Sequence, residues 1–437
     1  MVPADVAWMI VATALVLLMT PALAFFYGGL VRSKNALNTM MMSFISLGFL
    51  GVTWALVGYS LAFGTGNAWL GDLSFVFLKD VGLGEATGST IPHILFMAFQ
   101  ATFAIVTAAL ISGAIVERMK FGAYIVFLIL WSLVVYSPVC HWVWAPSGWL
   151  FKMGALDYAG GTVVHVNAAV SALVAAMVLG PRKDYARQAI LPHNVPFVLL
   201  GAGLLWFGWF GFNAGSAIAA GSANGFYKSA AVAFVTTMLA PSATLTVWSL
   251  LDIIRGGKAT AVGAATAIVV GLVAITPAAG HVSPLSALAL GGIAAFPSYF
   301  ALLYRAKTKL DDSLDVVAAH GVGGTVGALL TGVFSQKAWS GLVDGLLFGD
   351  PDQMRIQVIG VAAVIAYAAV MTFVILKVVG AVMPLRADVG DEGLGMDVTQ
   401  HGEEAYTSGE GAILVLPELE APQVALQARL ANEGGKA

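Results

Sequence analysis

The sequence predicts an all-α membrane protein that crosses the bilayer many times. Of its 437 residues, 59% are hydrophobic and only 10% are charged, whereas a soluble domain has roughly 25% charged residues. The apolar segments are long enough to cross a bilayer as helices, which need about 20 apolar residues each. A transmembrane β-barrel would instead show short segments of alternating hydrophobicity, and this pattern is absent from the sequence.

Eleven apolar spans are predicted between charged or Gly/Pro-containing loops, at 6–31, 38–63, 92–116, 121–141, 159–180, 196–219, 225–253, 259–277, 283–304, 315–335 and 355–384. Basic residues give their orientation, because cytoplasmic loops are enriched in Lys and Arg. The loops after odd-numbered spans hold twelve basic residues, and those after even-numbered spans hold five. We therefore expect the N-terminus outside the cell and the C-terminus in the cytoplasm.

The spans divide into two halves of five, about 6–180 and 196–335, followed by a last helix at 355–384. Because five is odd, the second half must be inverted relative to the first. Inverted halves are typical of secondary transporters, which bind substrate between them near the membrane midplane. We predict a membrane domain at 1–384 and a cytoplasmic tail at 385–437, which holds ten acidic and three basic residues.

Several other features narrow the class of protein. The single cysteine, Cys140, excludes an internal disulfide and a multi-cysteine metal site. The start of the chain has Asp5 and no basic leading segment, so no cleavable signal peptide is expected. We find no nucleophile–base pair outside the histidine-containing spans, so an enzyme is the least favoured class. No cofactor and no nucleic-acid partner are expected. The end of the tail is rich in Ala and Leu and could form a short helix.

Two histidines stand inside apolar spans, and each belongs to the last span of its half. His165 follows Gly-Gly-Thr-Val at 160–163, and the same tetrapeptide recurs at 323–326, after His320. Titratable groups at membrane depth are rare and usually face a cavity or a partner. The inverted repeat makes the histidines counterparts, so we expect their imidazoles within hydrogen-bonding distance. Small residues on the His165 stripe, such as Ala168, allow the two helices to come close.

The chemistry of this pair has more than one interpretation. Two neutral imidazoles in contact can pass a hydrogen bond along a narrow lumen, because each has one donor and one acceptor nitrogen. Two unrelated histidines, hydrogen-bonded separately within the bundle, are the alternative. A metal site is disfavoured, because two histidines without a further carboxylate or cysteine provide too few ligands for zinc.

Carboxylates and aromatic residues accompany the histidines. Asp157 and Asp315 each stand at a predicted helix start, where a carboxylate caps the helix and interacts with its dipole. Phe103 and Trp144 lie near the outer ends of spans that flank the proposed pore, although aromatic residues also form belts at membrane interfaces. A π-face can hold a cation that has lost part of its water, and Ser216 could accept a hydrogen bond from it.

Six segments between the first span and the tail form a recognisable set: FFYGGLVRSKN (25–35), FQATFAIVTAALISGAIVERM (99–119), LDYAGGTVVHVNAA (156–169), WFGFNAGSA (209–217), DVVAAHGVGGTVG (315–327) and GMDVTQHGEEAY (395–406). Together they closely resemble the Amt branch of the ammonium transporter (Amt/Rh) family. The resemblance implies an outer recruitment site, with Trp144, Phe103 and Ser216 holding ammonium and Asp157 shaping the site. It also implies a gate of two stacked phenyl rings, Phe103 and Phe212.

Below the gate, the resemblance implies a pore lined by the twin histidines His165 and His320, with Trp209 beside them. Ammonium would lose its proton and pass as ammonia, and the proton could travel separately. Methylammonium would act as an analogue of the substrate. Family members are homotrimers of the cell membrane, and a cytoplasmic PII-type signal protein typically regulates them. Two further functions fit the same resemblance. One is a membrane ammonium sensor on this scaffold, although the roughly 50 residues after Pro384 are too few for a signalling domain. The second is an Rh-type channel for ammonia or carbon dioxide.

Overall fold

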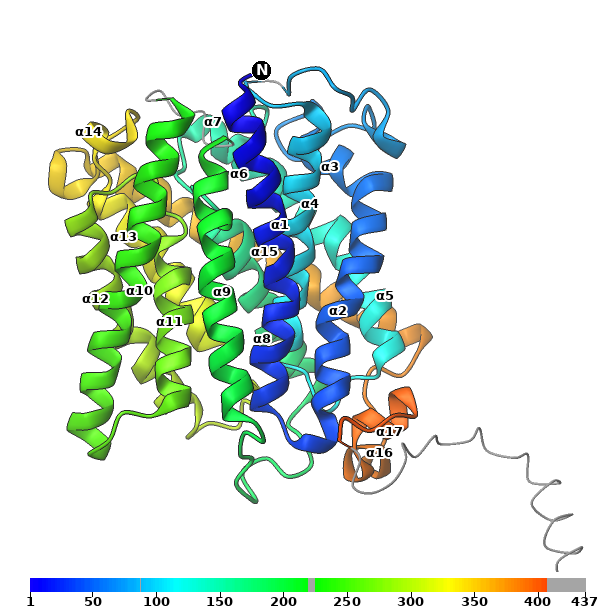
Figure 1. Ribbon diagram of the computed structural model, residues 1–437. Coiled ribbons are helices and arrows are strands. Elements are labelled where there is room, and N and C mark those ends of the chain that lie inside the picture. The colour runs from blue at the N-terminus through cyan, green and yellow to red at the C-terminus, as the bar shows by residue number, and fades with distance from the viewer. Residues whose placement is uncertain (87, 219–224, 407–437) are drawn as a thin grey trace, which may run out of the picture.

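The computed structural model describes residues 1–86, 88–218 and 225–406, and in these ranges the chain is helical, with loops and two isolated β-bridges. The long helices stand side by side in one bundle (Figure 1). The N-terminus lies at one end of the bundle, and the short helices α16 and α17 of the tail lie at the opposite end (Figure 1).

The first half of the bundle contains five spans, three of which include a π-helical turn. Their bounds are α1 Pro3–Leu30; α2 Ala36–Thr53 with the π-turn η2 Trp54–Gly58 and α3 Tyr59–Phe63; α4 His93–Ser112; α5 Phe121–Trp131 with the π-turn η4 Ser132–Tyr136 and α6 Ser137–Trp144; and the π-turn η5 Gly161–Val166 with α8 Asn167–Leu179. His165 therefore lies on a π-turn.

The second half and the last helix complete the bundle. Their bounds are α9 Val195–Gly215, α10 Phe226–Gly256, α11 Ala261–Ile275, α12 Pro284–Arg305, the π-turn η7 Val317–Val322 with α13 Gly323–Phe334, and α15 Pro351–Val382. The short elements in the connections and the tail are η1 Ser33–Asn35, η3 Val76–Leu78, α7 Trp149–Met153, η6 Ser216–Ile218, α14 Lys337–Ser340, η8 Leu346–Phe348, α16 Val389–Leu394 and α17 Met396–His401.

The eleven predicted spans correspond to these helices. Ten helical segments of the described chain are long and apolar enough to cross a membrane. The eleventh, α11, has 15 residues and is shorter than the predicted span at 259–277. The Thr260 side chain accepts a hydrogen bond from Gly263 N–H and caps the helix, which therefore begins at Ala261, after the predicted start at 259. Pro277 follows the end of the helix at Ile275.

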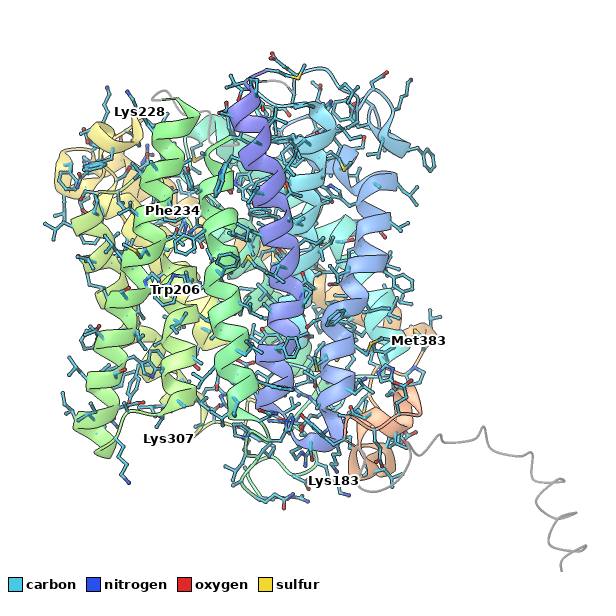
Figure 2. All side chains as sticks on the ribbon, in the orientation of Figure 1. Lys183, Trp206, Lys228, Phe234, Lys307 and Met383 are labelled. Carbon is cyan, nitrogen blue, oxygen red and sulfur yellow. The ribbon has the colours of Figure 1, made fainter. Side chains whose placement is uncertain are left out.

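Basic residues mark the two ends of the bundle. Lys183 and Lys307 lie at the end that carries the tail, and Lys228 lies at the opposite end (Figure 2). This distribution agrees with the predicted orientation, because the loops enriched in Lys and Arg face the cytoplasm. In this orientation the tail end of the bundle is the cytoplasmic end, and the N-terminus is outside.

The first part of the tail packs on the cytoplasmic end of the bundle. The Asp397 carboxylate accepts hydrogen bonds from the N–H groups of Leu37 (3.0 Å) and Asn38 (2.7 Å), at the start of α2. The Gln400 side chain accepts one from Phe121 N–H, at the start of α5 (3.0 Å). The tail thus caps two transmembrane helices. The short helix expected near the end of the tail lies outside the described residues.

Candidate functional site: an aromatic entrance above a histidine pair

Asp157 begins the helix that carries His165. Its carboxylate accepts hydrogen bonds of 2.5–3.1 Å from four successive N–H groups, those of Gly160, Gly161, Thr162 and Val163, and a further one from the Thr162 hydroxyl. The first N–H groups of a helix have no partner within the helix, so this buried carboxylate satisfies all of those that begin η5. Burial raises the pKa of the Asp157 carboxyl, and these hydrogen bonds oppose that shift.

The counterpart of Asp157 in the second half is Asp312, and the expectation that Asp315 caps the helix is wrong. The Asp312 carboxylate accepts hydrogen bonds from Val316 N–H (3.1 Å) and Val317 N–H (2.7 Å), whereas Asp315 pairs with Arg305 (2.7 Å). Asp157 precedes His165 by eight residues, and Asp312 precedes His320 by eight. The two Gly-Gly-Thr-Val segments do not occupy equivalent positions in this alignment of the halves, because one precedes His165 and the other follows His320.

The two π-turns bring His165 and His320 together in the interior. Their Nδ1 atoms are 3.2 Å apart, and their ring centroids are 5.2 Å apart with an interplanar angle of 30°. The expectation that the imidazoles lie within hydrogen-bonding distance is confirmed. In neutral rings one Nδ1 donates and its partner accepts. His165 Nε2 has no hydrogen-bonding partner among the described residues, so it remains free to bind a molecule in the lumen.

The absence of a side chain at Gly324 allows this close approach. A Cβ atom added there would lie 3.0 Å from the Cβ of His165 and 3.1 Å from the Gly161 carbonyl oxygen. Similarly, a Cβ on Gly321 would lie 3.2 Å from the Cβ of Ala169, which belongs to the predicted stripe of small residues. Close packing at the histidine pair thus depends on glycine in one helix and alanine in its neighbour.

Aromatic rings close the lumen on the outer side of the histidines. Phe103 and Phe212 are stacked, with ring centroids 4.1 Å apart and planes at 25°. Trp144 meets the Phe103 ring edge-on at 5.8 Å. The Phe212 ring is in turn 6.1 Å from the His165 ring. The predicted entrance, gate and pore residues therefore form one continuous column.

Hydrogen bonds fix the polar atoms at this entrance. Trp144 Nε1 donates to the Asp157 carbonyl oxygen (2.8 Å), so the carboxylate-capped loop also orients the indole. The Ser216 hydroxyl donates to the Phe212 carbonyl oxygen (2.8 Å). Because its proton is used there, the lone pairs of the Ser216 oxygen remain available to accept a hydrogen bond.

The lumen beside the histidines is narrow and apolar. Its cavity has a volume of about 10 Å³, which is about the least that holds a molecule of the size of water. The walls are Met19, Leu23, Phe26, Val106, Leu110, Val164, His165, Leu205, Trp209, Phe212, Val269 and His320. The Trp209 ring stacks on His165 at 5.4 Å, and its Nε1 donates to the Thr276 hydroxyl (2.9 Å). Sequence reasoning missed Thr276, because a threonine inside an apolar helix carries no signal of its own.

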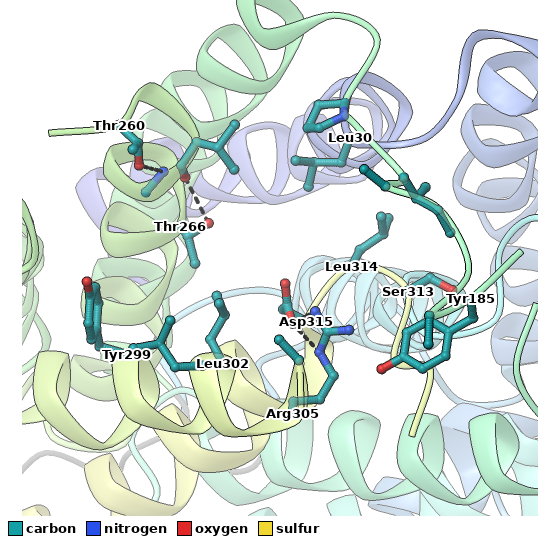
Figure 3. Close-up of a pocket in the computed structure, with 18 of the residues that line it drawn as sticks. Leu30, Tyr185, Thr260, Thr266, Tyr299, Leu302, Arg305, Ser313, Leu314 and Asp315 are labelled. Atoms are coloured by element: carbon teal, nitrogen blue, oxygen red, sulfur yellow. Dashed lines mark hydrogen bonds and ion pairs between the residues drawn. The ribbon is translucent and has the colours of Figure 1, made fainter. Parts of the chain in front are cut away.

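A wider cavity opens at the cytoplasmic end. It has a volume of about 580 Å³, and Leu30, Tyr299, Arg305 and Asp315 are among its lining residues (Figure 3). Arg305 Nε donates to the Asp315 carboxylate (2.8 Å) within it. Burial, together with the neighbouring charge of Asp315, raises the pKa of the adjacent Asp312 carboxyl above its usual range. The outer entrance is thus closed by aromatic rings, whereas the cytoplasmic end of the bundle holds this wide cavity with its ion pair.

A bundle of membrane-spanning helices with an aromatic entrance and a narrow apolar lumen is typical of a membrane transporter for a small polar solute. The Ammonium Transporter Family model matches residues 7–406. An ammonium transporter of Bacillus subtilis is 46% identical, over 92% of this chain and 98% of the relative. The crystal structure of Saccharomyces cerevisiae Mep2 has a TM-score of 0.85 at 35% identity, covering 94% of this chain and 93% of that one.

A structure titled Sensor Amt Protein is also similar, with a TM-score of 0.82 at 30% identity, over 91% of this chain and 98% of that one. The chain belongs to the ammonium transporter family. It is an ammonium transporter and a multi-pass protein of the cell membrane.

Proposed function

We propose that the column from Trp144 to His320 recruits ammonium outside the cell, removes its proton and conducts ammonia inward. Trp144 and Phe103 bind the cation through their π-faces, and the Ser216 oxygen accepts one of its N–H bonds. Asp157 holds the entrance loop in place without contacting the cargo. The observation that carries the proposal is the contact between His165 and His320 directly beneath stacked phenyl rings.

Deprotonation follows from the character of the lumen. Moving an ion from water into an apolar medium costs tens of kcal/mol on an idealised estimate, and this lumen is walled mainly by apolar side chains. Neutral ammonia avoids that cost and can still donate to His165 Nε2. Potassium has no proton to lose, so the same lumen excludes it. In this scheme the cargo undergoes no covalent change other than the loss of its proton. We therefore assign the protein to transport and not to enzymatic catalysis, in keeping with its relatives.

The assembly and the regulation are proposed on family membership. We propose a homotrimer with one pore in each subunit, and a PII-type signal protein as a cytoplasmic partner. The basic loops that carry Lys183 and Lys307, together with the docked tail, would form its contact surface. We take residues 1–384 as the transporting domain and residues 385–437 as the regulatory tail.

A sensor is the second candidate function, and the similarity to the Sensor Amt Protein structure favours it over an Rh-type channel. A sensor would bind ammonium with little flux. The two functions differ in one measurement, because a transporter in liposomes must generate ammonium-dependent current or internal pH change.

The test replaces the histidines one at a time. Loss of a hydrogen bond to a buried polar group costs about 1–3 kcal/mol, so His165→Ala and His320→Ala should each lower ammonium flux by about tenfold or admit potassium. Proteoliposome currents and pH changes, with methylammonium as competitor, measure both effects. His93→Ala is the matched control, because His93 bonds Tyr59 (2.6 Å) away from the column. Unchanged flux and selectivity in both pore variants would refute the assignment.

A further inference from the structure

A groove opens between the cytoplasmic ends of α8 and α15, and its lining residues are separate from those of the lumen beside the histidines. It has a volume of about 490 Å³ and is lined by Val178, Leu179, Leu376, Lys377, Gly380, Ala381, Leu385 and Arg386. Volumes of roughly 300–1,000 Å³ are typical of ligand pockets. Gly380 and Ala381 form the floor of the groove, because neither has a large side chain that would fill the space beside α15.

Both charged residues in the lining are cationic. Lys377 forms no ion pair and no hydrogen bond through its side chain with any residue that the structure describes, and its ammonium lies 5.3 Å from the centre of the Phe373 ring. A lysine on a hydrophobic helix is costly unless it reaches an interface or an anion. Lys377 stands five residues before the end of α15, so its long side chain can reach the headgroup region.

Arg386 places a second cation at the cytoplasmic edge of the groove. Its Nη1 donates to the Leu179 carbonyl oxygen at the end of α8 (2.9 Å), and its Nε donates to Glu392 (2.7 Å). These bonds hold the guanidinium in position, and 32% of the side chain remains exposed. An anion beside Lys377 could therefore bind both the fixed guanidinium of Arg386 and the flexible ammonium of Lys377.

The surroundings of the groove are apolar. Met177 on α8 and Val374, Val378 and Val382 on α15 are all exposed, Val382 to 84%. The surface thus changes from apolar chains along the helices to cations at their cytoplasmic ends. This is the order of groups along a phospholipid, from acyl chain to phosphate. Basic pockets between helices on this side of a membrane bind anionic lipid headgroups.

We propose that the α8–α15 groove is a binding site for an anionic phospholipid of the cytoplasmic leaflet. The phosphate lies between Lys377 and Arg386, and the acyl chains follow the exposed valines of α15. Because Arg386 also holds the end of α8 and pairs with the tail residue Glu392, a bound lipid contacts the junction of the His165 helix and the tail. The proposal is independent of the transport mechanism.

The test measures lipid binding to the full-length protein by native mass spectrometry, with phosphatidylglycerol and phosphatidylcholine titrated separately. We expect the wild type to prefer phosphatidylglycerol. A basic residue near an anionic headgroup contributes about 1 kcal/mol, so Lys377→Gln should weaken phosphatidylglycerol binding roughly fivefold and leave phosphatidylcholine binding unchanged. Ala381→Phe fills the groove without changing charge, and it should weaken the binding of both lipids.

Lys307→Gln is the control for a general loss of positive charge. Lys307 is an exposed lysine at the same end of the bundle, on the opposite side from Met383, which follows α15 (Figure 2). This variant should bind phosphatidylglycerol as the wild type does. Equal losses in Lys307→Gln and Lys377→Gln, or no preference for phosphatidylglycerol, would overturn the proposal. A changed oligomeric state in Ala381→Phe would also overturn it, because the groove would then be a contact between subunits.

Discussion

At the scale of single residues, polar side chains along the column use one atom for a contact within the protein, and we propose that a second atom contacts the cargo. Ser216 donates to Phe212 and keeps its lone pairs, and His165 engages His320 through Nδ1 and keeps Nε2. Trp209 follows the same principle, because Thr276 holds its Nε1 while its ring faces the lumen. Such fixed orientations allow an apolar lumen to bind a small polar molecule at defined atoms.

We predict that Thr276→Val impairs the pore although Thr276 does not line it. Valine keeps the shape but leaves Trp209 Nε1 buried without a partner, which costs about 1–3 kcal/mol. The melting temperature and the ammonium flux should both fall. Thr331→Val is the matched control, because the buried Thr331 hydroxyl bonds only the Gly327 carbonyl within its own helix among the described residues. The prediction fails if both variants behave alike.

The sequence could predict the individual pore residues because their types are unusual at membrane depth. Two histidines, and a tryptophan and a serine near span ends, are conspicuous in an apolar chain, and the resemblance to a family supplied their roles. Thr276 could not be found in this way. Threonine commonly bonds the carbonyl four residues before it in a helix, and Thr276 does so with Leu272 (2.8 Å). Its second role depends on packing against Trp209.

At the scale of elements, the two histidine helices begin in the same way. Each starts with an aspartate whose carboxylate caps the first turn, and each continues through a π-turn that carries the histidine. The residue three positions after each aspartate has a left-handed backbone, with φ of 110° at Gly160 and 59° at Asp315. Glycine adopts that conformation freely, and aspartate is one of the few residues with a side chain that tolerate it.

We predict that Asp157→Ala is more destabilising than Asp312→Ala. The first substitution leaves four buried N–H groups and a hydroxyl without their acceptor, and the second leaves two N–H groups. The first variant leaves three more groups unsatisfied than the second. Each unsatisfied group costs about 1–3 kcal/mol, so the difference should be at least about 3 kcal/mol. Thermal or denaturant unfolding of the purified protein measures it. Equal losses would show that the caps do not act as described.

The spans were predictable from the length of their apolar runs, but their local geometry was not. A π-turn adds one residue to a helical turn without changing the apolar composition of the span, so a hydropathy pattern does not reveal it. The Gly-Gly-Thr-Val repeat suggested the wrong alignment of the halves. The constant spacing from aspartate to histidine was the better signal, because it reflects the distance from the cap to the lumen.

At the scale of the whole molecule, the cytoplasmic loops and the tail form one connected structure. Glu117 pairs with Arg32 (2.7 Å) and Arg182 (3.0 Å), and Arg182 pairs with Asp311 (2.9 Å). These residues come from four different loops, and Glu117, Arg182 and Asp311 are buried. The tail joins them through the hydrogen bond from Ala387 N–H to the Arg118 carbonyl oxygen (2.8 Å). Composition predicted an acidic tail, but its docking depends on contacts between residues far apart in the sequence.

We predict that Asp397→Ala loosens the tail and destabilises the start of α2. Loss of a helix cap costs about 1 kcal/mol, and the N–H groups of Leu37 and Asn38 lose their acceptor. Cleavage by a protease between residues 385 and 406 should become faster, and the melting temperature should fall. Asp388→Ala is the control, because the Asp388 side chain is 83% exposed and pairs with Lys120 at a distance of 3.8 Å. Equal cleavage rates in the two variants would contradict the capping role of Asp397.

The two aspartate–histidine motifs are separated by the same 155 residues, from Asp157 to Asp312 and from His165 to His320. A fixed separation of this kind is what duplication of an ancestral five-span gene produces. Each copy crosses the membrane an odd number of times, so a fused second copy enters the bilayer upside down. One inherited motif then faces both sides of the cell membrane. The same left-handed turn carries Gly160 on the outer side and Asp315, paired with Arg305, on the inner side, so one backbone motif serves two chemically different mouths.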